Sequence, residues 1–311
     1  VSAVCVTGLS TVDVPTYWTP FGHLMILLMI KLGGFGIITF ALFLGILLAR
    51  RIGLNSRIVG SAEMPGMDGG NPRRLILKLF IATSSFEFIV ATFVACRLWL
   101  GYGYDLPDAI WYGIFHAVSA FNNAGFALYS DSLMGFAADG WMLMPLNFAV
   151  IIGGLGFPVL FELGRRIIGR VKASQIGGVI ESALHWTLST RLVLWSTLVL
   201  LTFGTLYFAF IEWNNPATIG DMGFGEKLLN SFTQSVQPRT AGFNSVDLGQ
   251  VYPATLMGMD LLMFIGGGSA STAGGIKLTT AAVLIFIVWT EIRGETAVNV
   301  GSRRLPRSIQ R

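Results

Sequence analysis

The sequence predicts an all-α polytopic membrane protein built from repeated, parallel units. Of the 311 residues, 53% are hydrophobic and only 12% are charged, which is about half the charged share of an average soluble domain. Several apolar runs reach the length of about 20 residues that a helix needs to cross a bilayer. A short glycine-centred pattern also recurs three times at equal spacing, which indicates repeated structural units.

The composition excludes a soluble enzyme, because so few charged side chains could not build a polar surface. The two cysteines, Cys5 and Cys96, indicate neither a disulfide framework nor a metal site. The three histidines are scattered without metal-ligand spacing, and we interpret them as packed or interfacial: His23, His116 and His185. The sequence starts at Val1 with no readable signal peptide, so we interpret it as part of a longer chain.

Four continuous apolar segments are predicted to span the membrane, at residues 21–49, 75–100, 142–163 and 190–211. A fifth, residues 254–290, is predicted to be a helix broken at residues 266–275, where five of ten residues are glycine. Two shorter stretches, residues 107–121 and 224–236, cannot span the membrane, and a glycine turn follows each of them. Stretches of this length are typical of re-entrant helices.

Basic residues predict the orientation. Sixteen of the 21 fall in two long loops and the tail: Arg50, Arg51, Arg57, Arg73, Arg74, Lys78, Arg165, Arg166, Arg170, Lys172, Arg191, Arg293, Arg303, Arg304, Arg307 and Arg311. The positive-inside rule places these segments in the cytoplasm. The opposite side carries nine of the 17 acids and would attract cations: Asp13, Asp105, Asp108, Asp131, Asp139, Glu212, Asp221, Glu226 and Asp247.

The three copies of the glycine-centred pattern cover residues 2–9, 119–126 and 236–243. Their glycines, Gly8, Gly125 and Gly242, are 117 residues apart in both cases. A second glycine mark follows each copy, at residues 32–36, 152–156 and 265–269. Because a basic segment follows the second span of every unit, the units share one orientation, unlike the inverted repeats of many secondary transporters.

Parallel pore-loop units can surround a central axis and replace the water around a cation with backbone carbonyl oxygens. Glycine allows backbone angles that are closed to other residues, and the C-terminal end of each re-entrant helix carries partial negative charge. We therefore expect the cation to contact main-chain oxygens only. These are placed on Val6, Thr7, Gly8, Asn123, Ala124, Gly125, Thr240, Ala241 and Gly242.

The segments at residues 5–9, 122–126 and 238–244, with the glycine-rich break ending at Lys277, resemble the Trk/Ktr/HKT superfamily of potassium transporters, most of all the bacterial Ktr membrane subunit. The resemblance covers essentially the whole chain. It implies four units around a pseudo-fourfold potassium path, a homodimer and a cytoplasmic nucleotide-binding regulatory ring. It also implies that the break is an intramembrane gate, formed by Gly266, Gly267, Gly268, Ser269, Gly274, Gly275 and Lys277.

A fourth filter glycine would be expected 117 residues beyond Gly242, past Arg311. We therefore interpret the sequence as an internal fragment of four segments: residues 1–60 as the end of unit one, 61–180 as unit two, 181–290 as unit three with the broken span, and 291–311 as a cytoplasmic linker toward unit four.

Several features allow a second interpretation. Close helix packing is the better explanation of the glycine pairs Gly33, Gly34, Gly153 and Gly154. Residues 266–277 lack the spacing of a phosphate-binding loop, which disfavours nucleotide binding there.

Charged residues within the spans leave alternatives open. Lys31, Glu87 and Arg97 are either structurally paired or part of an ion path. Lys277 is a candidate for repelling cations near the gate, and Arg239 for holding loop carbonyls. The tail at residues 303–311 is a candidate contact for anionic lipid or the regulatory subunit.

Together these patterns predict a bacterial, multi-pass protein of the plasma (inner) membrane that takes up potassium through a channel-like pore, passively or with sodium stimulation. We expect no enzymatic activity, no covalent cofactor and no nucleic-acid partner, with potassium as the transported ion and sodium as a candidate activator. Expected partners are a second copy, the regulatory ring and membrane lipid. Two alternatives remain. The parallel repeats disfavour a secondary transporter of small anions or neutral solutes. The missing catalytic constellation disfavours an intramembrane enzyme.

Overall fold

The structure is a computed structural model, which describes residues 1–51, 72–176, 186–293, 299–300 and 303–304. The described part is helical apart from two paired two-residue strands, β1 (Asn299–Val300) and β2 (Arg303–Arg304). Its helices are α1 (Val14–Tyr17), α2 (Pro20–Arg51), α4 (Pro72–Tyr102), α5 (Leu106–Phe121), the 3-10 helix η1 (Met134–Phe136), α6 (Gly140–Leu155), α7 (Phe157–Ile176), α8 (Leu188–Glu212), α9 (Phe224–Val236), α10 (Pro253–Phe264) and α11 (Leu278–Ile292). The predicted all-α class is confirmed.

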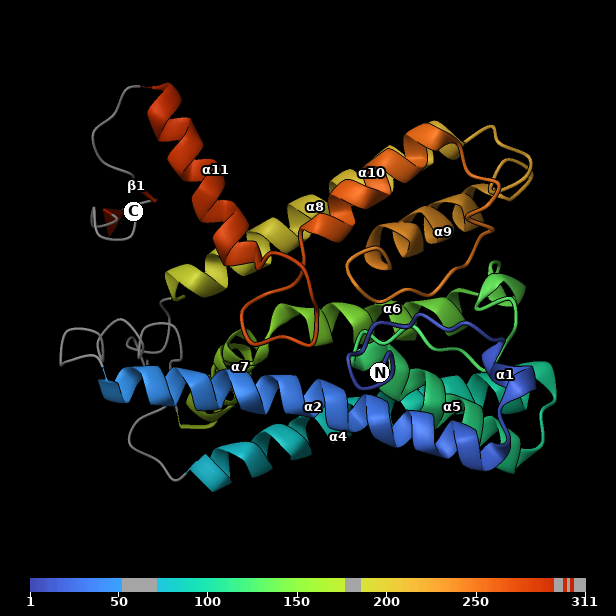
Figure 1. Ribbon diagram of the computed structural model, residues 1–311, viewed down its shortest axis with the longest axis horizontal. Coiled ribbons are helices and arrows are strands. Elements are labelled where there is room, and N and C mark those ends of the chain that lie inside the picture. Colours follow the sequence, from blue (N-terminus) through green and yellow to red (C-terminus); the bar gives the residue numbers. More distant parts are fainter. Residues whose placement is uncertain (52–71, 177–185, 294–298, 301–302, 305–311) are drawn as a thin grey trace.

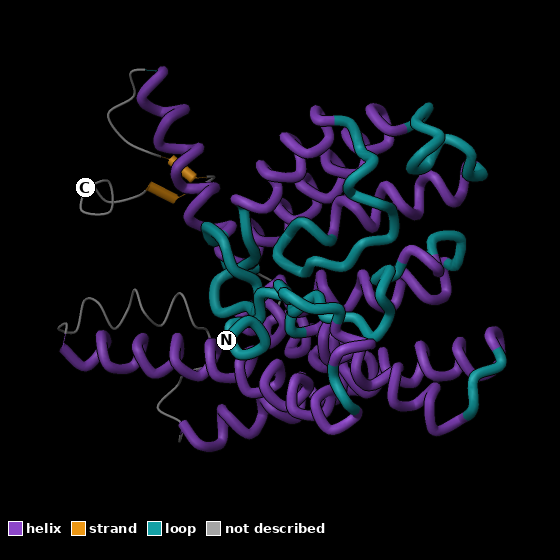
Figure 2. The backbone as a smooth tube through the Cα atoms, turned by 45° about the vertical axis from the view of Figure 1, so that its right-hand side comes forward, coloured by secondary structure: helices purple, strands orange, loops and turns teal. Residues whose placement is uncertain are grey.

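The helices lie in two groups with loops between them (Figure 1). Helices α2, α4, α5 and α6 form one group, and α8, α9 and α10 form the other. In Figure 2 the loop segments gather at the centre, between the groups. The short helices α5 and α9 occupy the two stretches predicted to be re-entrant, and each leads into this central region.

Two of the described helices are long and apolar enough to cross a membrane, α4 over Ile76–Tyr102 and α8. Helix α2 covers the first predicted span, with side chains described as far as Gly36. Helices α10 and α11 lie on either side of residues 265–277, so the predicted break in the last span is present.

The predicted span at residues 142–163 is wrong as a single helix. The chain bends by 105° between α6 and α7. Pro158 has no N–H to donate to the carbonyl of Gly154 and would clash there in a continuous helix. Gly156, with a φ of +91° and a ψ of +148°, takes a backbone conformation that is essentially confined to glycine, and α6 ends there. The bend therefore follows from a glycine and a proline inside an apolar run.

The two ends of the molecule differ in charge. The C-terminal ends of α2, α7 and α11 and the N-terminal ends of α4 and α8 lie toward the left of Figure 1, and most predicted cytoplasmic basic residues fall in these segments. At the other end, Arg97 of α4 donates to the carboxylate of Asp139 at 2.7 Å, and the Tyr102 hydroxyl donates to the same carboxylate at 3.0 Å. Arg97 is therefore structurally paired, and Asp139 also accepts from the Trp141 N–H at the start of α6.

Glycine allows α6 to pack directly against the C-terminal end of α5. A Cβ atom added to Gly153 would lie 1.9 Å from the carbonyl oxygen of Phe121, whereas one added to Gly154 would meet only the Asn123 side chain, at 3.8 Å. Gly33 and Gly34 are also closely packed, against Val4 and Asn122. Close packing thus explains three of the four paired glycines.

This contrast predicts different stabilities for neighbouring variants. We expect Gly153→Ala to lower the melting temperature of the purified protein strongly, because the backbone of α5 or α6 must shift, at a cost of about 1–3 kcal/mol. Gly154→Ala should have little effect and serves as the matched control. Equal melting temperatures for the two variants would contradict this packing.

Candidate cation filter and gate

Three loops meet at the centre of the molecule. We call them filter loop 1 (residues 5–9), filter loop 2 (residues 122–126) and filter loop 3 (residues 239–243). Each glycine has a positive φ, of +77° at Gly8, +70° at Gly125 and +91° at Gly242. The residue two positions earlier also has a positive φ: Val6 at +53°, Asn123 at +56° and Thr240 at +70°.

The residues between them, Thr7, Ala124 and Ala241, do not have positive φ. The three loops therefore share one alternating backbone conformation. A left-handed residue other than glycine costs about 1–2 kcal/mol. Strain of this kind, repeated at equivalent positions, is characteristic of functional backbone.

Hydrogen bonding among the described residues leaves most carbonyls of these loops free. The Thr7 N–H donates to Ser2 at 3.0 Å, and the Ala124 N–H donates to Ser119 at 2.8 Å, at positions 117 residues apart. In filter loop 3 the N–H groups of Ala241 and Gly242 both donate to Gln237. Within the described ranges, none of the nine carbonyl oxygens predicted to bind the cation accepts a hydrogen bond. Buried carbonyls without a hydrogen bond are costly unless water or a cation satisfies them.

The loops are neighbours around a common centre. A Cβ atom added to Gly8 would lie 2.4 Å from the Ala124 carbonyl oxygen, and one added to Gly125 would lie 2.3 Å from the Ala241 carbonyl oxygen. One added to Gly242 would meet only the Gly125 Cα, at 3.6 Å. Filter loops 1, 2 and 3 therefore follow one another, and no described carbonyl lies in the corresponding place beside Gly242.

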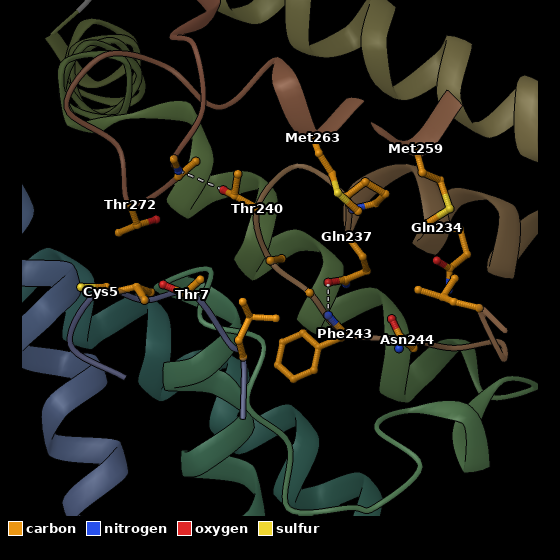
Figure 3. Close-up of a pocket in the computed structure, with 18 of the residues that line it drawn as sticks. Cys5, Thr7, Gln234, Gln237, Thr240, Phe243, Asn244, Met259, Met263 and Thr272 are labelled. Atoms are coloured by element: carbon orange, nitrogen blue, oxygen red, sulfur yellow. Dashed lines mark hydrogen bonds between the residues drawn. The ribbon is translucent and has the colours of Figure 1, made fainter. Parts of the chain in front are cut away.

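A cavity of about 660 Å³ lies between filter loop 1 and filter loop 3. In Figure 3, Cys5 and Thr7 line one side, and Gln237, Thr240, Met259 and Met263 line the other. Its wall also includes Gly274 and Lys277 of the broken span.

Buried polar side chains hold filter loop 3. Gln237 donates to Asn147 of α6 at 2.9 Å and accepts from the Phe243 N–H at 3.3 Å. Asn147 in turn donates to Thr233 at 2.8 Å. Arg239 is buried, and its guanidinium makes no hydrogen bond within the part of the chain that the structure describes, so the predicted grip on loop carbonyls is absent there.

His116 connects the helix before filter loop 2 with the segment after it. Its Nδ1 lies 2.8 Å from the Tyr112 carbonyl, and its Nε2 accepts from the Leu128 N–H at 3.2 Å. These partners fix the neutral tautomer with the proton on Nδ1. His116 is fully buried, in agreement with the expectation of a packed histidine.

The residues that follow filter loops 1 and 2 meet at the face that the basic residues predict to be outside. The Ser130 hydroxyl donates to Asp13 at 2.7 Å, and the Thr16 hydroxyl donates to the same carboxylate. The hydrogen bonds from these hydroxyls hold the pKa of Asp13 below its usual range, and the one from Ser130 has the larger effect. These contacts therefore favour the ionised form of Asp13.

Residues 265–277, which we call the glycine-rich loop, dock on the bend between α6 and α7. The bend frees the carbonyls of Gly153 and Gly154, which accept from the N–H groups of Thr272 at 3.3 Å and Gly268 at 2.8 Å. In return, the Phe157 N–H donates to Ala270 at 3.2 Å. Because Pro158 has no N–H, the Gly154 carbonyl remains available to accept from Gly268, and it forms part of the docking site.

The same loop reaches two of the filter loops. The Thr272 hydroxyl lies 3.2 Å from the Phe121 carbonyl and 3.3 Å from Oδ1 of Asn123. The Gly274 N–H donates to the Thr240 hydroxyl at 3.1 Å (Figure 3). The structure therefore brings the predicted gate residues against the predicted filter residues.

The TrkH family model, described as "Cation transport protein", matches residues 1–310. The chain belongs to the TrkH family. It is 39% identical to Ktr system potassium uptake protein B of Bacillus subtilis over 94% of this chain and 62% of that protein. It is 33% identical to the potassium/sodium uptake protein NtpJ of Enterococcus hirae over 98% of this chain and 64% of that protein.

Among solved structures, the potassium transporter TrkH from Vibrio parahaemolyticus has a TM-score of 0.67. The two sequences are 19% identical, and the matched region covers 99% of this chain and 58% of the TrkH chain. This likeness confirms the fold. The chain spans about three fifths of the length of the curated relatives it matches.

Membership in the TrkH family confirms the family resemblance found in the sequence. The family consists of transport proteins, so the chain is not an enzyme. Its apolar helices and its family make it a multi-pass membrane protein of the bacterial Trk/Ktr type.

Several functional features were missed in the sequence. The bend at Gly156 had a signal, a glycine and a proline within three residues. Val6 and Thr240 had no signal, since β-branched residues rarely adopt positive φ, whereas Asn123 belongs to a residue type that is enriched there. The Asn147–Gln237 contact joins residues 90 positions apart and could be found only in three dimensions.

Proposed function

We propose that the protein takes up potassium through a pore whose filter is the main chain of the three filter loops. The nine free carbonyl oxygens on three matching backbones are the observation that carries this proposal. Rings of carbonyl oxygens replace the hydration shell of potassium. The names of the relatives, potassium uptake proteins and a potassium/sodium uptake protein, agree with it.

A fourth loop completes the filter in this proposal. The cavity between filter loops 1 and 3 supports it, and so does the finding that no carbonyl of the described residues lies opposite Gly242. Residues 1–60, 61–180 and 181–290 then correspond to successive units, with 291–311 leading to the fourth. A fourth loop from the same protein would place its backbone in the cavity, between filter loops 1 and 3.

The glycine-rich loop is the gate in this proposal. It lies against filter loops 2 and 3 while being tied to the bend of α6 and α7 by backbone hydrogen bonds. Main-chain hydrogen bonds of this kind can be exchanged for water without removing a core side chain. The gate residues are those predicted: Gly266, Gly267, Gly268, Ser269, Gly274, Gly275 and Lys277.

Lys277 places a positive charge on the wall of the cavity. Its ammonium group donates to the Ala273 carbonyl at 2.6 Å. Two like unit charges about 4 Å apart repel each other by about 1 kcal/mol in water, and by more in a less polar pore. We expect Lys277→Met to raise the rate of potassium uptake by about fivefold, measured with rubidium as tracer. Lys277→Arg, which keeps the charge, should stay near the original rate, and equal rates for both variants would contradict this role.

Further parts of the proposal concern the assembly. We include a homodimer, a cytoplasmic nucleotide-binding regulatory ring, contact with membrane lipid and activation by sodium. The name of one relative, a potassium/sodium uptake protein, supports the part that concerns sodium, and the names of two others, proteins of a Ktr system, agree with a further component.

Growth at limiting potassium tests the proposed function. The protein, expressed from its complete gene in bacteria that lack their own potassium uptake systems, should restore growth and take up rubidium. Sodium in the assay medium should raise the rate of rubidium uptake, because activation by sodium is part of the proposal. Failure to restore growth, with the protein present in the membrane, would overturn the proposal.

A further inference from the structure

Behind filter loop 2 lies a buried ion pair that the filter and the gate do not explain. Lys31 of α2 and Glu87 of α4 are paired, with side chains 20% and 6% exposed. The Lys31 ammonium group also lies 3.4 Å from the Thr83 hydroxyl and 5.4 Å from the centre of the Phe80 ring. Charges within a membrane segment are costly and are kept for pairing or for function.

The other carboxylate oxygen of Glu87 accepts a hydrogen bond from Asn122, the first residue of filter loop 2. Nδ2 of Asn122 donates to Glu87 Oε1 at 2.9 Å and to the Val118 carbonyl at 2.8 Å. On the far side, the amide packs on Gly34 of α2, where an added Cβ atom would lie 2.1 Å from the Asn122 Oδ1. The Asn122 amide is therefore held between α2 and α4 in one orientation.

Asn122 directly precedes the strained residue of filter loop 2. Asn123 has a φ of +56°, and its amide contacts the Arg239 carbonyl at 3.4 Å and the Thr272 hydroxyl at 3.3 Å. A continuous chain of polar contacts thus runs from Lys31, through Glu87 and Asn122, to the backbone that carries three of the filter oxygens.

We propose that Glu87, held by Lys31, is a positioning residue that determines ion selectivity. Its carboxylate anchors Asn122 and thereby maintains the left-handed backbone at Asn123. Both carboxylate oxygens are occupied by protein donors and the charge is balanced by Lys31, so direct contact with the passing ion is not its role. This inference rests on the proposed function.

Paired variants separate the anchor from the charge. Lys31→Met with Glu87→Gln removes both charges but keeps an amide oxygen that can accept from Asn122. Lys31→Met with Glu87→Leu removes both charges and the acceptor. Neither leaves an unpaired buried charge, which would itself destabilise the protein. Asn122→Ala is a third variant that leaves the ion pair intact.

The measurement is the ratio of rubidium to sodium uptake by cells expressing the complete gene, with the amount and melting temperature of each purified variant. We expect the Gln double variant to stay within about twofold of the original ratio. The Leu double variant and Asn122→Ala should lower it about tenfold, a loss of about 1.4 kcal/mol of discrimination.

Equal ratios in the two double variants would overturn the positioning role, whether both are unchanged or both are reduced. An unchanged ratio in Asn122→Ala would overturn it as well, and this variant decides the matter if the Leu double variant does not fold. Absence of uptake by the unsubstituted protein would instead overturn the proposed function and this role with it.

Discussion

Gly125→Ser should lower potassium uptake at least about tenfold and raise the share of sodium that passes. Gly125 has a φ of +70°, and an added Cβ atom would lie 2.3 Å from the Ala241 carbonyl oxygen and 3.1 Å from the Gly242 Cα. A side chain there costs about 1–2 kcal/mol in backbone strain alone. It also displaces filter loop 3, so oxygens of two loops leave their positions at once.

A tenfold change corresponds to about 1.4 kcal/mol, which lies within the range of backbone strain expected for a side chain at Gly125. Rubidium and sodium uptake in cells lacking other potassium systems would measure the change. Gly225→Ala in α9 is the matched control, since an added Cβ atom there meets nothing within 4 Å. If Gly125→Ser kept the original ratio of the two ions, its loop would not be part of the filter.

Replacing Gly267 and Gly268 together by alanine should raise the rate of potassium uptake several-fold while leaving ion preference unchanged. Added Cβ atoms would lie 2.4 Å from the Gly154 carbonyl oxygen and 2.1 Å from the Leu155 carbonyl oxygen. Both carbonyls belong to the end of α6, where the glycine-rich loop docks. The loop can then no longer sit against the bend and is displaced from below filter loops 2 and 3.

Gly274→Ala is the control within the same loop. An added Cβ atom there meets only a methyl group of Thr240, at 3.7 Å, which is ordinary contact. Rubidium uptake of the two variants at equal protein levels gives the comparison. A double variant that folds and transports at the original rate would rule out the glycine-rich loop as the gate.

The sequence predicted the parts of this architecture that depend on local pattern. Helices α5 and α9 lie within one residue of the predicted stretches, because a proline or glycine begins each and a glycine turn follows each. The equal spacing of Gly8, Gly125 and Gly242 predicted three loops of like conformation, and their backbone angles agree. The break in the last span followed from five glycines in ten residues.

Other features depend on contacts between distant segments. Glu87 was recognised as an unusual charge, but its partner Lys31 is 56 residues away and on another helix. The bend at Gly156 was overlooked because apolar composition alone predicts a span, whereas Pro158 and the docking of residues 268–272 decide the local geometry. Arg239 was expected to hold loop carbonyls, but Gln237 and Asn147 fix filter loop 3 instead.

The location of bound ions in a crystal would test whether the three filter loops bind the transported cation. Crystals of the complete transporter grown with thallium or rubidium in place of potassium would show the ion by anomalous scattering. We expect a peak at coordination distance from carbonyl oxygens of Thr7, Ala124 and Ala241 or their loop neighbours. An ordered ion bound by side chains elsewhere, with no peak among the three filter loops, would contradict it.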